Sequence, residues 1–163
     1  MSKSYRSVGV LAFIAMFAAF GIFPARASDE TEAQAVVTEW VAEFNRGDVT
    51  AFAARCARRA AVIDGFPPFA WTSCADWMSS YASNSKANKL TDGKLSIGWA
   101  VSAFTEGNRS YVVYPATFSD KEDGKVVVYN GTWTITLLKV NGRWAITGSG
   151  SNWGGTYTVR SEP

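Results

Sequence analysis

The sequence of 163 residues contains no histidine and only two cysteines. Without an imidazole, the chain cannot use a histidine general base, a histidine-ligated metal or a Ser/His/Asp triad. Two cysteines alone cannot complete the four-ligand shell of a structural zinc ion. The sequence also lacks a glycine-rich phosphate loop and a cluster of metal ligands. We therefore expect no metal and no cofactor.

Charged residues make up only 18% of the chain, and the two signs nearly balance, with 16 Lys and Arg against 14 Asp and Glu. Three of the basic residues, Lys3, Arg6 and Arg26, lie in the first 27 residues, which contain no acid. The rest of the chain therefore carries 13 basic and 14 acidic residues. A net charge near zero without a continuous basic stripe does not suit nucleic-acid binding, so we expect no nucleic-acid partner.

The first 27 residues have the pattern of a secretory signal peptide. Lys3 and Arg6 precede the uncharged stretch 7–23, which is followed by Pro24 and the A-x-A cleavage pattern 25–27. We predict a signal peptide over residues 1–27, a mature domain over 28–163, and export to a bacterial periplasm or the extracellular space. An uncleaved anchor stays an alternative, but the stretch is shorter than the roughly 20 residues of a span. We expect no stable membrane anchor after leader removal.

Export bears on the two cysteines, because thiols oxidise outside the cytosol. We predict a disulfide between Cys56 and Cys74, which would remove about 3 kcal/mol of chain entropy from the unfolded state. The alternative is that both are small buried apolar residues.

The first half of the mature chain has helical spacing. Apolar residues recur three and four apart from Val36 to Phe44, which predicts an amphipathic helix over 30–46 that ends at Gly47. We predict a shorter helix after Asp48 that carries Cys56 inward, and a brief strand over residues 61–63. A third helix is predicted to start at a capping box at Ser73 and to fray through residues 83–89.

From Lys94 the apolar period changes to two, which is typical of strands. We predict four consecutive antiparallel strands, over about 94–103, 111–118, 125–140 and 143–153, with a hairpin turn at Asn141-Gly142. The charged segment 120–124 is interpreted as a hairpin tip without chemistry. Helices followed by strands indicate an α+β fold in which three N-terminal helices cover one face of a curved sheet.

The order of elements resembles the nuclear transport factor 2-like superfamily, which includes ketosteroid isomerase, scytalone dehydratase and SnoaL-like cyclases. The local resemblance lies in residues 37–48 (VTEWVAEFNRGD) and 60–64 (AAVID), which look like the opening of a ketosteroid isomerase. The resemblance covers nearly the whole mature chain. It implies a cone-shaped curved antiparallel sheet, an apolar pocket inside the cone and a homodimer.

The resemblance also assigns candidate roles to three residues. Asp64 falls where the isomerase keeps the carboxylate that moves a proton, so it is our candidate catalytic base. Trp40 occupies the position of the hydrogen-bonding tyrosine, and Thr136 that of the protonated aspartic acid. Because an enolate without these donors loses several kcal/mol of stabilisation, we do not expect ketosteroid isomerase activity. Asp64 can also be read as an Asp-Gly turn residue that bonds its own backbone.

Aromatic residues are numerous, and most belong in the core of so small a domain. Our candidate pocket residues are Trp40, Trp71, Tyr81, Tyr114 and Thr136. Three functional hypotheses remain. The first is an exported protein that binds a small hydrophobic or aromatic molecule in an apolar cone pocket. The second is a cofactor-free isomerase, dehydratase or cyclase with Asp64 as general base. The third is a non-catalytic dimerisation or interaction module.

Overall fold

The computed structural model describes residues 28–160, with side chains to residue 154, so the predicted leader lies outside the described residues. The first helix, α1 (Asp29–Arg46), begins and ends as predicted. The Thr31 amide donates to the Ser28 side chain, and Gly47 closes the helix with φ 68°. These end signals are local in sequence, so neighbouring residues are enough to predict where the helix begins and ends.

Two further helices precede the main strands. Helix α2 (Val49–Ala54) is capped by Asp48, and α3 (Cys74–Ala87) by Ser73. The Asp76 amide donates to Ser73 Oγ at 3.1 Å and that hydroxyl donates to Asp76 Oδ2 at 2.7 Å, which confirms the capping box. In contrast to the expected fraying, α3 continues through the polar run to Ala87.

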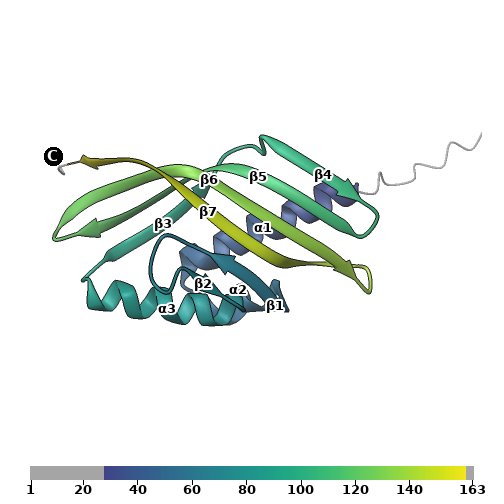
Figure 1. Ribbon diagram of the computed structural model, residues 1–163, viewed down its shortest axis with the longest axis horizontal. Coiled ribbons are helices and arrows are strands. Elements are labelled where there is room, and N and C mark those ends of the chain that lie inside the picture. Colours follow the sequence, from purple (N-terminus) through teal and green to yellow (C-terminus); the bar gives the residue numbers. More distant parts are fainter. Residues whose placement is uncertain (1–27, 161–163) are drawn as a thin grey trace, which may run out of the picture.

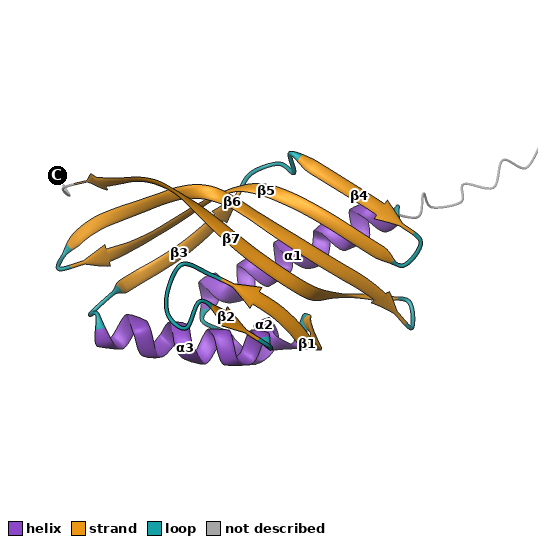
Figure 2. Ribbon diagram, viewed as in Figure 1, coloured by secondary structure: helices purple, strands orange, loops and turns teal. Residues whose placement is uncertain are grey.

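The sheet contains seven strands, which curve over the helices (Figures 1 and 2). In chain order they are β1 (Cys56–Ile63), β2 (Ala70–Trp71), β3 (Thr91–Ile97), β4 (Ser102–Glu106), β5 (Arg109–Glu122), β6 (Lys125–Val140) and β7 (Arg143–Arg160). The spatial order is β2-β1-β7-β6-β5-β3, and β4 pairs with β5 beside β3. The predicted α+β architecture and the curved sheet are confirmed.

Two details of the sheet differ from the prediction. Strand β1 begins at Cys56, which was expected in a helix, and it runs parallel to β7, so the sheet is mixed. The strand expected over 94–103 is divided into β3 and β4, which pair with successive parts of β5. The division lies opposite Pro115, whose ring nitrogen has no hydrogen to donate to a continuous neighbour.

The hydrophobic core lies between the concave face of the sheet and the helices (Figure 1). Its largest fully buried side chains are Trp40, Phe52, Ile135 and Ile146. The predicted disulfide is present: Cys56 and Cys74 are bonded at 2.01 Å and join the start of β1 to the start of α3. Among the described residues, no helix has the length and apolar character needed to cross a membrane.

Candidate functional site

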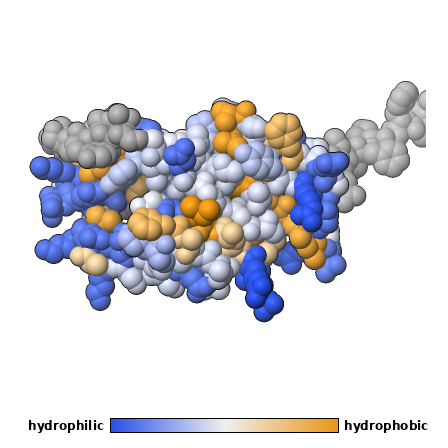
Figure 3. Space-filling model, viewed as in Figure 1, coloured by the Kyte–Doolittle hydropathy of each residue, from blue (hydrophilic) through white to orange (hydrophobic). Residues whose placement is uncertain are grey.

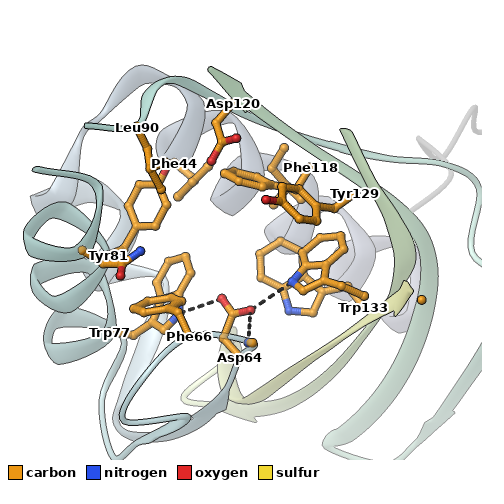
Figure 4. A pocket seen from close by; sticks show the side chains of 15 residues that line it. Phe44, Asp64, Phe66, Trp77, Tyr81, Leu90, Phe118, Asp120, Tyr129 and Trp133 are labelled. Carbon is orange, nitrogen blue, oxygen red and sulfur yellow. Dashed lines mark hydrogen bonds between the residues drawn. The ribbon is translucent and has the colours of Figure 1, made fainter. Parts of the chain in front are cut away.

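A cavity of about 410 Å³ lies at one end of the curved sheet, between α3, the β1–β2 loop and strands β5 and β6 (Figure 4). Its wall is mainly aromatic, and two carboxylates reach it from different elements. The described residues that line it are Phe44, Asp64, Gly65, Phe66, Trp77, Tyr81, Asn84, Leu90, Leu95, Phe118, Asp120, Tyr129, Trp133, Trp153 and Gly154.

Asp64 follows β1 directly and points into this cavity (Figure 4). Its Oδ1 accepts hydrogen bonds from Ser151 Oγ at 2.6 Å, Trp153 Nε1 at 3.0 Å and the Gly65 amide at 2.7 Å. Its Oδ2 accepts from Trp77 Nε1 at 3.0 Å. Asp64 is therefore both the turn residue and the pocket acid that the sequence allowed. These four donors occupy most of the acceptor positions of its carboxylate.

Replacing Asp64 by Asn is expected to lower the free energy of unfolding by about 1.5 kcal/mol, because one charge-assisted bond is lost and one donor faces an amide NH₂. Urea denaturation at neutral pH measures the change. The matched control is Asp92→Asn, at an exposed carboxylate 3.4 Å from Lys121, where the expected change is within about 0.5 kcal/mol. An equal loss of unfolding free energy in both variants would show that the hydrogen bonds to Asp64 contribute nothing specific to stability.

Asp120 is the second carboxylate of the cavity, and it comes from β5. Only 4% of its surface is exposed, and its Oδ1 has no hydrogen-bond partner among the described residues. Burial, and then the neighbouring carboxylate of Glu122, raise the pKa of Asp120 to about 6. Glu122 itself accepts a hydrogen bond from the Tyr129 hydroxyl. Asp120 is thus a carboxyl group that titrates close to neutral pH inside the cavity.

Asp120 was not predicted as a site residue, because the charged segment that contains it was expected to form a hairpin tip. In the structure β5 continues four residues beyond Phe118, to Glu122, and the turn is correspondingly shorter. The available signal was the period of two: Val112, Tyr114 and Ala116 are buried at alternate positions, and the same alternation reaches Asp120.

Tyr81 is the one predicted pocket aromatic that lines the cavity. It projects from α3, and burial raises the pKa of its hydroxyl above the ordinary value. Gly93 makes room for it, since a Cβ at that position would lie 2.0 Å from the Tyr81 hydroxyl oxygen. A tyrosine held protonated in this way can donate a hydrogen bond to a ligand.

The other predicted pocket aromatics lie in the core instead. Trp40 is fully buried and stacks on Phe52, with ring centroids 4.6 Å apart. Trp71 is buried behind Phe66, and its Nε1 donates to Ser80 Oγ at 2.9 Å. Tyr114 is buried outside the cavity lining, and burial raises its pKa to about 12. Large side chains on the inner face fill most of the cone, so the cavity occupies only one end of it.

Thr136 does not line the cavity either, because it points to the other face of the sheet. Its neighbours Ile135 and Leu137 are buried on the inner face, and side chains alternate along a strand. The Thr136 hydroxyl lies 3.2 Å from the Thr147 hydroxyl on the adjacent strand. The residue therefore has no access to a ligand in the cavity.

No group of three or more potential metal ligands comes together within the part of the chain that the structure describes. The polar groups of the site are two carboxylates, two tyrosine hydroxyls and the Asn84 carboxamide, and most of the remaining lining is aromatic. Such a set can bind an apolar molecule, fix its polar part and exchange a proton with it.

No protein-family model matches the sequence. A search of curated proteins finds no match. Solved structures do match the fold. A ketosteroid isomerase-like protein from Erwinia carotovora atroseptica is 16% identical, with a TM-score of 0.63 over 80% of this chain and 100% of that chain.

Two other solved structures are similar over comparable lengths. A nuclear transport factor 2-like superfamily protein from Salmonella enterica serovar Typhimurium is 11% identical, with a TM-score of 0.66 over 78% of this chain and 92% of that chain. A type 2 hexachlorocyclohexane dehydrochlorinase is 9% identical, with a TM-score of 0.67 over 80% of this chain and 87% of that chain. The chain has the nuclear transport factor 2-like α+β fold.

Proposed function

We propose that this is an exported protein that binds a small hydrophobic or aromatic molecule in the cavity at the end of its curved sheet. One observation carries the proposal: an aromatic cavity of about 410 Å³ into which a few polar groups converge. Ligand sites in proteins have this composition and lie within this range of volumes. The A-x-A leader and the Cys56–Cys74 disulfide support export, because disulfides persist in oxidising compartments.

The arrangement of the rings supports an aromatic ligand. Phe44, Tyr81 and Phe118 approach one another edge-on or tilted, with centroids 5.2–6.3 Å apart, and leave ring surface facing the cavity. A cavity of this size beside so many rings offers dispersion contacts to a bound molecule. Aromatic faces and edges accept another ring in offset or T-shaped geometry, so a flat apolar ligand suits them.

Saturable quenching of tryptophan emission by p-nitroanisole, a neutral aromatic compound, tests the proposal on the oxidised mature chain. Asn84, on the cavity side of α3, is replaced by Trp to fill the space, and we expect binding to weaken about tenfold or more. The matched control is Ser83→Trp, an exposed neighbour on the same helix, which adds the same fluorophore outside the cavity. Equal binding in both variants, or no saturable quenching in the parent, would contradict the proposed site.

A second candidate function is proton transfer without a cofactor. The observation that favours it is the pKa of Asp120, raised to about 6, because a general acid or base works best when its pKa lies near the working pH. Asp64, which already accepts four hydrogen bonds, suits orientation better than proton transfer. Deuterium exchange at the α-carbon of 2-tetralone should then be lost in Asp120→Asn. Unchanged exchange in that variant would exclude the role.

We also propose a homodimer, because the sheet exposes apolar side chains near β4. Trp99 is 94% exposed, and Val101, Phe104 and Tyr111 are also exposed. Phe104 and Tyr111 are cross-strand partners and share one face, and Figure 3 shows apolar side chains over the β3–β4 connection. A contiguous apolar surface of this kind is typical of an interface. Sedimentation should give a dimer that Phe104→Lys dissociates; a monomeric parent would overturn the assignment.

A further inference from the structure

The described residues that line the cavity carry negative charge without a compensating cation. Asp64 and Asp120 reach it from opposite walls (Figure 4), and its described lining includes no lysine or arginine. Neither carboxylate takes part in an ion pair with any described residue. The nearest lysine in sequence, Lys121, lies 3.4 Å from the carboxylate of Asp92. A buried carboxylate without a cation is costly, so this arrangement calls for a chemical reason.

Asp64 supplies one carboxylate at the wall of the cavity. All four of its hydrogen-bond donors are uncharged: two indole N–H groups, one hydroxyl and one backbone amide. They bond the carboxylate but bring no positive charge to neutralise it. The charge at this wall of the cavity is therefore available to a ligand.

Asp120 supplies a second acceptor, and this one is unsatisfied. Its Oδ1 is buried and has no hydrogen-bond partner among the described residues, and the residue lines the cavity. Its neighbour Glu122 is also acidic, and the group that bonds Glu122 is the uncharged hydroxyl of Tyr129. The side chains around Asp120 thus increase the negative potential instead of relieving it.

The aromatic rings, like the two carboxylates, favour a positively charged ligand. The faces of Trp and Tyr rings attract cations, and desolvated contacts of this kind contribute about 2 kcal/mol. Trp77 and Tyr81 stack with centroids 5.8 Å apart on one side, and Phe118 and Trp153 meet at 6.1 Å on the other. All four line the cavity together with the two carboxylates. Rings and acids in this combination form a cage suited to an ammonium group.

We propose that the ligand of this cavity is an organic cation, an amine or quaternary ammonium compound whose charged nitrogen lies between Asp64 and Asp120 and whose apolar part contacts the aromatic rings. The inference rests on the proposed binding function and narrows it to one chemical class. A neutral molecule would leave the two acids unpaired, and an anion would be repelled by both. A cation is attracted both by the two carboxylates and by the ring faces.

The test compares benzyltrimethylammonium with neopentylbenzene, its uncharged isostere, by titration of tryptophan emission of the oxidised mature chain at pH 7.5. We expect the cation to bind at least about tenfold more tightly than the isostere. Asp120→Asn should weaken binding of the cation about tenfold. The matched control is Asp123→Asn, which removes the same charge at an exposed hairpin position with φ 47°, where Asn is well tolerated. Its affinity for the cation should equal that of the parent.

The outcomes separate this inference from the proposed function. Equal affinity for the two compounds overturns the cation inference and leaves binding of small apolar molecules in place. No binding of either compound overturns both. An equal loss of affinity in Asp120→Asn and Asp123→Asn also overturns the inference, because the charge effect would not be located in the cavity. The comparison of the two compounds on the parent protein needs no variant, so it stands even if Asp120→Asn does not fold.

Discussion

Replacement of Trp40 by Ala is expected to lower the free energy of unfolding by about 4 kcal/mol, measured by urea denaturation. The indole is fully buried in the middle of α1, and its ring lies 4.6 Å from that of Phe52 and 4.9 Å from that of Trp133. Truncation removes the contacts that the indole makes between α1, α2 and β6. It also leaves a cavity that the close-packed core cannot close. Losses of this size are a large fraction of the stability of a small domain.

Trp40→Phe is the graded control for this prediction. A phenyl ring keeps part of the stack on Phe52 and leaves a smaller void, so the expected loss is about 1 to 2 kcal/mol. A loss below about 1 kcal/mol in Trp40→Ala would show that the residue borders open space, as a pocket residue does, and is not enclosed by the core. The stability measurement therefore also decides between the two roles that the sequence allowed for Trp40.

Local signals made much of the fold predictable. The ends of α1, the capping box at Ser73 and the hairpin at Asn141 each depend on a few neighbouring residues, and all three occur where expected. Pairing direction is different, because a short apolar strand pairs in either direction. The parallel pairing of β1 with β7 depends on the position and direction in which the preceding helices place the start of β1. A local sequence pattern does not contain this information.

Only part of the site could be predicted from the sequence. The sequence pattern gives neither the depth at which an inward side chain is buried nor the register between strands. Asp64 could be located because an apolar strand leads directly to it, and it does line the cavity. Trp40 and Tyr81 both face inward, and a sequence pattern does not tell whether an inward ring meets other rings or empty space. Thr136 was assigned by alignment, but the register of β6 against β7 shifts between Thr136 and Leu137, and the side chain points outward.

Asp120→Asn is expected to raise the free energy of unfolding by about 2 kcal/mol at pH 7.5 and to leave it nearly unchanged at pH 4. The pKa of Asp120 is raised from 3.8 to about 6 in the folded protein, so the folded state holds its proton more tightly than the unfolded state. Stability therefore falls as the pH rises from about 4 to about 6, and the full cost is present above that window. Asparagine has a similar shape and never ionises, so it avoids this cost.

The size of the effect follows from the environment of Asp120. The full shift corresponds to about 3 kcal/mol, and solvent screening at a cavity residue reduces that figure. Among the residues whose side chains the structure describes, the groups that face Asp120 are Glu122 on its own strand, Tyr129 on β6 and, across the cavity, Tyr81 and Asp64, and none of these four is a cation.

The measurement is urea denaturation of the parent, Asp120→Asn and the control Asp123→Asn at pH 4, 5, 6 and 7.5. Only the difference between the parent and Asp120→Asn should grow with pH, whereas Asp123→Asn should stay parallel to the parent. A difference that does not change with pH would mean that Asp120 has an ordinary pKa and that the cavity does not hold an unpaired acid.

A stabilising substitution inside a cavity is characteristic of a residue kept for function at a cost in stability. If Asp120 is kept because it binds a cationic ligand, saturating benzyltrimethylammonium should raise the free energy of unfolding of the parent protein at pH 7.5. The increase should offset much of the loss that ionisation of Asp120 causes.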